Sequence, residues 1–268
     1  MSSAARLLAV LDLFGAGRPD WSVEEAASCL GVPASSMYRT FRELRSSGLL
    51  TGAGNGRHAL GPTIIRLDWQ LRTSDPLVLA AQPELDRIVA DRAIPAVAIL
   101  CRLYEDRVMC VAQAASAEAD FAIAYQRGRP MPLFAGSASR VILAGLSPSR
   151  LRRLYRDRPQ AFGEAGLGED WDQVRRALRQ LAENGSCIAA GEVDPGMRAA
   201  SVALVSPDGM PASLSLVSRA PRFTASAAAR AVAPLRAHAQ RIEQVARTLA
   251  RSRETAARQP DGNPGPAR

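Results

Sequence analysis

Residues 21–61 read WSVEEAASCLGVPASSMYRTFRELRSSGLLTGAGNGRHALG. Ser22 and Glu25 have the spacing of a capping box, which predicts a helix that begins there. Pro33 suits the first turn of a second helix, because its missing N–H would have no partner at that position. A glycine-rich hairpin follows at residues 49–60. The stretch therefore predicts a winged helix-turn-helix.

The second of these helices has two chemically different faces. At about 100° per residue, Met37, Phe41 and Leu44 fall on one side, which we expect to be buried. Hydroxyl and guanidinium groups occupy the rest of the surface, at Ser35, Ser36, Tyr38, Arg39, Arg42 and Arg45. Such groups contact phosphates and base edges in the major groove. A solvated face on an ordinary surface helix is the alternative, and the capped helix before it and the wing after it favour DNA.

The hairpin itself carries one further candidate. Arg57 follows the glycine-rich turn and is placed to contact a phosphate or enter the minor groove. The alternative is a loose polar hairpin without contact to DNA. Charge supports DNA binding only weakly: the chain of 268 residues has a net charge of +8, yet residues 1–75 hold eight arginines against seven acidic residues. The arrangement of charge is therefore more informative than its total.

Composition excludes several other classes of protein. No apolar run approaches the roughly 20 residues that a membrane span requires, and no signal peptide is recognisable, so we expect the cytoplasm. The four cysteines lack CxxC spacing, so neither a metal nor another cofactor is expected. Reduced core thiols are favoured, with a redox pair between Cys101 and Cys110 as the alternative. Without a nucleophile elbow, HExxH or P-loop, and with His238 in a terminal helix, no enzyme is predicted.

The chain divides by pattern into four parts. Residues 1–61 form the winged helix-turn-helix, with a first amphipathic helix before the capped pair. Residues 62–75 read as a linker helix whose apolar face suggests self-association, packing against its own domain being the alternative. Residues 76–250 form a second domain. Residues 251–268 are rich in Pro, Gly and Arg and are expected to be disordered.

The second domain alternates between runs of strand and helix character. Helices are expected at 77–92, from about 137, at 150–158, 171–184 and 225–249, and strands within 96–114 and at 120–127, 186–190, 198–205 and 212–218. Residues 128–132 read as a turn, and residues 191–196 as a loop between two strands. The order predicts an α+β fold with a central antiparallel sheet flanked by helices.

Several of these segments together resemble one family. Residues 7–14 and 21–50, with PLFAGSASRVILAGL at 132–146 and GEVDPGMRAASVAL at 191–204, look like the IclR family of bacterial transcriptional regulators. The resemblance covers about residues 4 to 250. It implies a winged helix-turn-helix joined by a linker helix to a GAF-like α/β effector-binding domain. It further implies operator DNA and a small-molecule effector as partners, and a homodimer or dimer of dimers.

The resemblance also implies where an effector binds. Carried across segment by segment, the positions are Ile123, Tyr125, Ser137, Ala138, Ala189, Met197, Arg198, Ala199 and Ser215. Ala189 and Ala199 replace polar residues of some family members, which makes the cavity roomier and drier. Arg198 and the helix N-terminus near Ser137 suit a carboxylate, so a small, aromatic or other, organic acid is expected. The alternative is that these small residues merely allow close packing and that Arg198 points to water.

These observations predict a ligand-responsive, sequence-specific DNA-binding regulator. The resemblance to the family favours repression of a catabolic operon. Two alternatives stay open: an activator of the same family, and a constitutive DNA binder without a ligand. The sequence pattern does not predict the identity of the effector, the operator sequence or the choice between dimer and tetramer.

Overall fold

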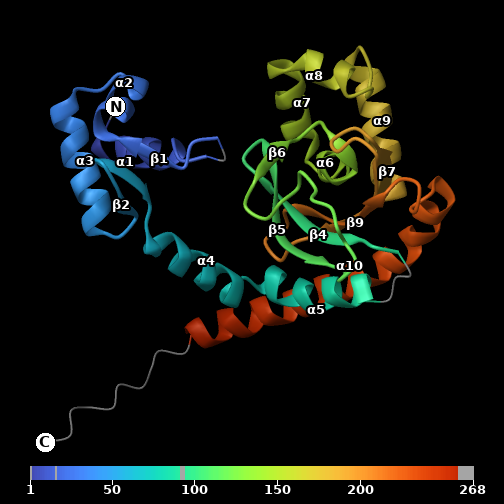
Figure 1. Cartoon of the computed structure of the whole chain (residues 1–268). Coiled ribbons are helices and arrows are strands. Elements are labelled where there is room, and N and C mark those ends of the chain that lie inside the picture. The colour runs from blue at the N-terminus through green and yellow to red at the C-terminus, as the bar shows by residue number, and fades with distance from the viewer. Residues whose placement is uncertain (1, 16, 91–93, 259–268) are drawn as a thin grey trace, which may run out of the picture. The chain divides into compact units, whose positions relative to one another are not determined.

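The computed structural model describes residues 2–15, 17–90 and 94–258 (Figure 1). The chain divides into two compact units, Met1–Ser74 and Asp75–Arg268. The first unit contains α1 (Ser3–Asp12), β1 (Asp20–Ser22), α2 (Val23–Leu30), α3 (Ala34–Ser46), β2 (Leu50–Gly54), β3 (Arg57–Leu60) and α4 (Pro62–Ser74). Its three strands form an antiparallel sheet in the order β1-β3-β2, in which β1 was not foreseen from the sequence.

The predicted capping box is confirmed at the start of α2. The Ser22 hydroxyl accepts a hydrogen bond from the Glu25 N–H at 3.1 Å, and the Ser22 N–H donates to the Glu25 carboxylate at 3.0 Å. Gly31 ends the helix in the left-handed conformation, with φ of 62°. Pro33 is the N-cap of α3, one position before the expected one. Local sequence signals therefore place both helices to within a residue or two.

The core of the first unit lies under α3. Met37, Phe41 and Leu44 are buried, as the helical spacing predicts, and pack with Val10 of α1. The His58 ring of β3 meets the Phe41 ring edge-on, with centroids 5.0 Å apart, and so fastens the wing to this core. By contrast, α4 contributes no buried residue along its length, all of which is described. Its apolar side chains are exposed, at Ile65, Leu67, Trp69 and Leu71.

The second unit is built on a six-stranded sheet with helices on both faces. Its elements are α5 (Pro76–Ala90), β4 (Val97–Tyr104), β5 (Arg107–Ala115), β6 (Pro130–Pro132), α6 (Gly136–Ala144), α7 (Pro148–Asp157), α8 (Pro159–Glu164), α9 (Trp171–Asn184), β7 (Ser186–Ala190), β8 (Met197–Val205), β9 (Pro211–Arg219) and α10 (Ala225–Arg258). The strand order is β6-β5-β4-β9-β8-β7, antiparallel throughout. The predicted α+β class with a helix-flanked antiparallel sheet is therefore confirmed.

Two hydrophobic cores cover the two faces of this sheet. Figure 1 shows α5 and α10 side by side along one face, with α6 on the other. Successive side chains of a strand point to opposite faces, and β8 shows this alternation. Ala200 and Val202 belong to the core under α5 and α10, whereas Met197 and Ala199 face α6. This alternation decides which side chains reach the space between the sheet and α6.

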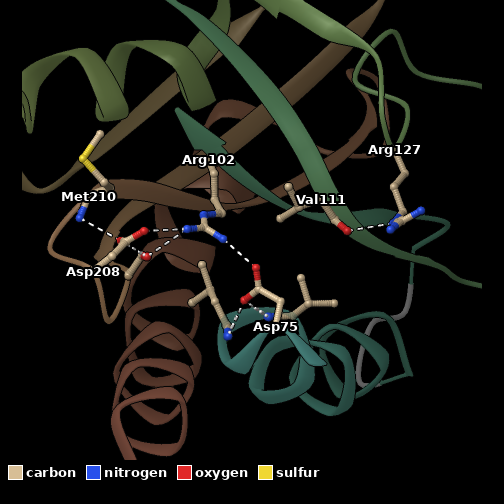
Figure 2. Close-up of polar contacts among 9 residues, drawn as sticks. Asp75, Arg102, Val111, Arg127, Asp208 and Met210 are labelled. Atoms are coloured by element: carbon tan, nitrogen blue, oxygen red, sulfur yellow. Dashed lines mark hydrogen bonds and ion pairs between the residues drawn. The ribbon is translucent and has the colours of Figure 1, made fainter. Parts of the chain in front are cut away.

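An arginine of β4 ties the start of α5 to the turn between β8 and β9 (Figure 2). The Asp75 carboxylate accepts a hydrogen bond from the Leu77 N–H at 2.8 Å and so caps α5. Arg102 donates to that carboxylate at 2.6 Å and to the Asp208 carboxylate at 2.8 Å. The two carboxylates and the arginine hold together three segments that lie far apart in the sequence.

Two expectations about secondary structure are wrong. Residues 120–127 were expected as a strand, but they run irregularly, with Ile123 and Tyr125 buried. The alternation of apolar residues is there, yet the Ala124 N–H donates to the Asp194 carboxylate instead of joining a strand ladder. The residues expected as a turn contain the short strand β6, which pairs with β5. A side-chain acceptor from a distant loop thus replaced the backbone pairing that the pattern predicted.

The predicted disordered tail begins too early. Residues 251–258 continue α10 as helix. Six of its eight residues are good helix formers, Arg, Glu and Ala. The prolines and glycines on which the prediction rested begin only at position 260. Residues 259–268, the remainder of that prediction, lie outside the described residues.

Candidate functional site

Most of the residues predicted to contact DNA surround one groove along α3. Ser35, Tyr38, Arg39, Arg42 and Arg45 are exposed and line it, while Phe41 and His58 also border it. Ser36 is half-buried and is not part of that lining. Burial of the opposite face fixes the rotation of the helix, and so directs this set outward.

The side chains of this face differ in how far they are already engaged. The Tyr38 hydroxyl donates to the Glu24 carboxylate, which raises the pKa of Tyr38. Arg39 forms a loose ion pair with Glu43, 3.8 Å between nitrogen and oxygen. Among the described residues, the guanidinium groups of Arg42 and Arg45 have neither a hydrogen bond nor an ion pair to a protein group. These two guanidinium groups therefore present their full donor capacity to the surface.

Arg57 departs from its expected role. Its Nε donates to Asp20 at 2.6 Å, and its Nη2 lies 3.1 Å from the Glu25 carboxylate. The hydrogen bond that Arg57 donates to Asp20 raises the pKa of Arg57 most, followed by the one that it donates to Glu25. The guanidinium thus joins β3 to β1 and α2 rather than standing free on the wing. No sequence pattern indicated β1, the strand that brings Asp20 beside this arginine.

Glu25 is the electrostatic centre of this arrangement. Its pKa is lowered from 4.5 to about 2, first by the hydrogen bond from the Ser22 N–H, then by those from Arg57 and Arg18. The ionised carboxylate thus serves both as a helix cap and as the counter-ion of the wing. Ionisation of Glu25 therefore stabilises the first unit.

In the second unit, the predicted effector-binding residues border a single cavity. It lies between the sheet and α6 and has a volume of about 40 Å³. All nine predicted positions line it, namely Ile123, Tyr125, Ser137, Ala138, Ala189, Met197, Arg198, Ala199 and Ser215. Sequence reasoning missed seven others, which are Ile99, Gly136, Gly191, Glu192, Val193, Asp194 and Val217. Strand pairing would have added Ile99, which stands directly opposite Ser215.

Serine and tyrosine hydroxyls form one polar part of the cavity wall, beside the charged residues Glu192, Asp194 and Arg198. Ser201 donates to Ser137 at 2.8 Å and shares a hydrogen bond of 2.7 Å with Ser215. The Tyr125 hydroxyl donates to the Ala135 carbonyl at 2.9 Å. Burial raises the pKa of Tyr125 far above its usual value, so it stays a neutral donor. Most of the remaining wall is apolar.

Arg198 does not have the orientation that was predicted. It borders the cavity by its place in β8, but its Nη1 donates to the carbonyls of Ala220 and Phe223, at 3.1 and 2.5 Å. Phe223 belongs to the core on the α5 and α10 face of the sheet. Alternation along β8 therefore directs Met197 and Ala199 to the cavity and the guanidinium between them away from it. In this structure, the Nη1 donor that a carboxylate fork would need is therefore engaged by backbone carbonyls.

The first turn of α6 is also already occupied. Glu192 accepts a hydrogen bond from the Gly136 N–H at 3.3 Å and pairs with Arg140 at 3.1 Å. The N–H groups predicted to receive a ligand carboxylate therefore face a carboxylate of the chain itself.

The cysteines follow the expected pattern only in part. Cys101 and Cys110 are fully buried and face each other across β4 and β5 as free thiols. Burial raises the pKa of Cys101, which keeps that thiol protonated. Cys29 is exposed on α2, contrary to the prediction of a core thiol. Among the described residues, no group of His, Cys, Asp and Glu could hold a metal ion.

A winged helix-turn-helix followed by an α/β unit with an internal cavity defines a transcriptional regulator that joins a DNA-binding and a ligand-binding unit in one chain. The family model described as "Bacterial transcriptional regulator IclR C-terminal" matches residues 72–244, and "IclR helix-turn-helix domain" matches residues 3–53. The chain belongs to the IclR family. Its relatives are named as transcriptional regulators rather than as enzymes.

Individual relatives are distant. The "Pca regulon regulatory protein" of Pseudomonas putida is 25% identical over 78% of this chain and 71% of that protein. A solved IclR regulator from Alicyclobacillus acidocaldarius has a TM-score of 0.75 at 24% identity, covering 91% of this chain and 98% of that one. An IclR homologue from Microbacterium hydrocarbonoxydans, solved with 4-hydroxybenzoate, has a TM-score of 0.71 at 23% identity, covering 92% and 100%. These structures share the fold of this chain.

No helix within the part of the chain that the structure describes is both long enough and apolar enough to cross a membrane.

Proposed function

We propose that this protein is a ligand-responsive repressor of a catabolic operon, and that its effector is a small carboxylate with an apolar, preferably aromatic, body. The observation that carries this proposal is the cavity of the second unit, which combines apolar walls with a chain of serine hydroxyls. Concave sites with mostly apolar walls and a few well-placed polar groups are typical of small-molecule binding.

The DNA-binding half of the proposal rests on α3. Among the described residues of its exposed face, Arg42 and Arg45 have guanidinium groups without a protein partner. Arg39 forms only a loose ion pair with Glu43. We assign base or phosphate contacts in the major groove to these arginines, with Ser35, Ser36 and Tyr38 in support. Arg57 acts instead by holding the wing in place.

The exposed apolar side chains of α4 support self-association. A helix that exposes Ile65, Leu67, Trp69 and Leu71 presents an apolar surface that water does not favour. We assign this face of α4 to contact with a second copy of the chain. Two copies would bind a near-palindromic operator, with half-sites spaced by the symmetry of the dimer.

The effector class draws on this chain and on two relatives. One structural relative binds 4-hydroxybenzoate, and the relative from Pseudomonas putida is named for the Pca regulon. In this chain Tyr125, Ser137 and Ser215 offer hydroxyls beside apolar walls, which fits a ring with a polar substituent. An activator would use the same contacts. A constitutive DNA binder would have no need of the cavity, which favours a ligand.

The test is fluorescence anisotropy of the full chain with DNA from upstream of its own gene, against a scrambled duplex and over a range of salt. We expect a preference of about 10³ or more for the specific duplex. Added 4-hydroxybenzoate or benzoate should weaken specific binding about fivefold or more, as a repressor requires. A ligand-dependent increase would indicate an activator. Equal, steeply salt-dependent binding to both duplexes would overturn the proposal.

A further inference from the structure

The loop between β7 and β8, residues 191–196, closes over the cavity, and we refer to it as the strap. Gly191, Glu192, Val193 and Asp194 all border the cavity. The Gly191 N–H donates to the Met197 carbonyl at 2.9 Å, which closes the base of the strap. Access to the cavity from this side therefore depends on what holds the strap down.

Two carboxylates of the strap fasten it to the rest of the unit. Asp194 accepts the Ala124 N–H through both oxygens at 3.0 Å. Glu192 accepts the Gly136 N–H and pairs with Arg140, so that it spans the first turn of α6. The N-cap residue Ala135 has no side chain that could serve α6 in this way. Glu192 thus occupies the position that favours an anion most in the cavity wall.

Arg140 is only partly satisfied by this arrangement. Its Nη1 lies 3.1 Å from Glu192, and its Nη2 donates to the Ala165 carbonyl at 3.0 Å. Its Nε is buried and has no partner among the described residues. A buried donor without a partner is unfavourable, and a carboxylate bound side-on to an arginine engages Nε and a terminal nitrogen together. Glu192 therefore leaves one donor of Arg140 without an acceptor, and Arg140 lies one helical turn after the cavity-lining residue Gly136.

We propose that Glu192 holds the anion position of the cavity in the ligand-free protein, and that an effector carboxylate displaces it and takes over Arg140 and the Gly136 N–H. This inference rests on the proposed carboxylate effector. A third carboxylate beside Glu192 and Asp194 would meet two like charges, so binding of the effector and closure by Glu192 exclude each other. Anionic effectors release the strap, and neutral molecules of the same shape leave it closed. Arg140 and Glu192 together determine the charge of the ligand.

The fastening of the strap is tested without any ligand. Glu192→Gln keeps the size of the side chain and removes its charge, and Glu183→Gln, at an exposed position of α9, is the matched control. Hydrogen–deuterium exchange of the full chain should show faster exchange across residues 191–197 in the first variant only. Equal exchange in both variants would overturn the role of Glu192.

The exchange of carboxylates is tested by calorimetric titration with 4-hydroxybenzoate, benzoate and neutral 4-hydroxybenzamide. Glu192→Gln should bind the two acids about fivefold tighter or more, because the internal competitor is gone. Arg140→Gln should bind them about 30-fold more weakly, with Arg140→Lys between the two, and the amide should bind all variants alike. Unchanged or weaker binding of the acids by Glu192→Gln would overturn the exchange.

The proposed function can fail separately from this inference. If no variant binds either acid, the carboxylate class and the exchange are both overturned, whatever the DNA measurement shows. If the acids bind as expected but DNA affinity does not respond to them, the exchange stands and the regulatory proposal fails. Thermal unfolding of each variant verifies that it is folded.

Discussion

The arginines of α3 and those around the cavity share one chemistry and have opposite surroundings. Arg42 and Arg45 extend from a helix face without protein partners among the described residues. Arg140 is paired with Glu192, and Arg198 donates to two backbone carbonyls. An exposed guanidinium can bind a partner directly, whereas an engaged one must first lose what it holds. The α3 surface can therefore bind a large polyanion directly. At the cavity, a ligand carboxylate must first displace Glu192 from Arg140.

Removing the buried ring of Phe41, which supports α3, should have the largest effect on the exposed arginines. Phe41→Ala should destabilise the first unit by about 3–5 kcal/mol, because a buried ring is lost with its contact to His58. Thermal unfolding and anisotropy should show loss of the first unit and of DNA binding. Binding of an effector to the second unit should persist. The exposed variant Tyr38→Phe should retain full stability, and intact DNA binding in Phe41→Ala would contradict the placement of α3.

A direct test of the exposed arginines follows. Arg42→Ala should cost about 1–3 kcal/mol of DNA affinity if the side chain reads a base, or lower the salt slope by about 1 if it holds a phosphate. Arg179→Ala, exposed on α9 of the other unit, is the control. Anisotropy over a range of salt measures both quantities. An unchanged affinity together with an unchanged slope would refute the assignment.

The closed site can be probed through its hydroxyl chain. Ser201→Ala removes the hydrogen bonds to Ser137 and Ser215 and leaves buried hydroxyls short of a partner. The second unit should lose about 1–3 kcal/mol in denaturant unfolding. Ser149→Ala, at an exposed position of α7, should leave the midpoint unchanged. Coincident curves for both variants would show that the chain of serines contributes nothing.

The smallest expected effect concerns acid. The folded pKa of Glu25 is about 2, below its ordinary 4.5, so its contribution is fully present above pH 4.5 and is lost as the pH falls towards 2. Glu25→Gln should therefore flatten the decline in stability of the first unit across that window. Circular dichroism at a series of pH values measures this decline, with Glu43→Gln as an exposed control. An equally steep decline in Glu25→Gln would rule out the linkage.

Sequence spacing alone was enough to predict the helix pair and the outward face of α3. A capping box and a helical period depend on spacings of three and four residues, which backbone geometry converts directly into positions on a helix. The resemblance to one family assembled nine cavity residues from distant segments, all of which border the cavity. The resemblance did not predict which atoms of those residues point into the cavity.

The partners of the charged groups, by contrast, became known only from the three-dimensional fold. Arg57 meets Asp20 across 37 positions of sequence, and Gly136 meets Glu192 across 56. Strand register turned Arg198 away from the cavity, and the Asp194 carboxylate drew residues 120–127 out of strand pairing. Spacing along the chain reports which side chains share a face. The partner that a charge finds depends on register and on loops that close over long separations, and no local pattern encodes either.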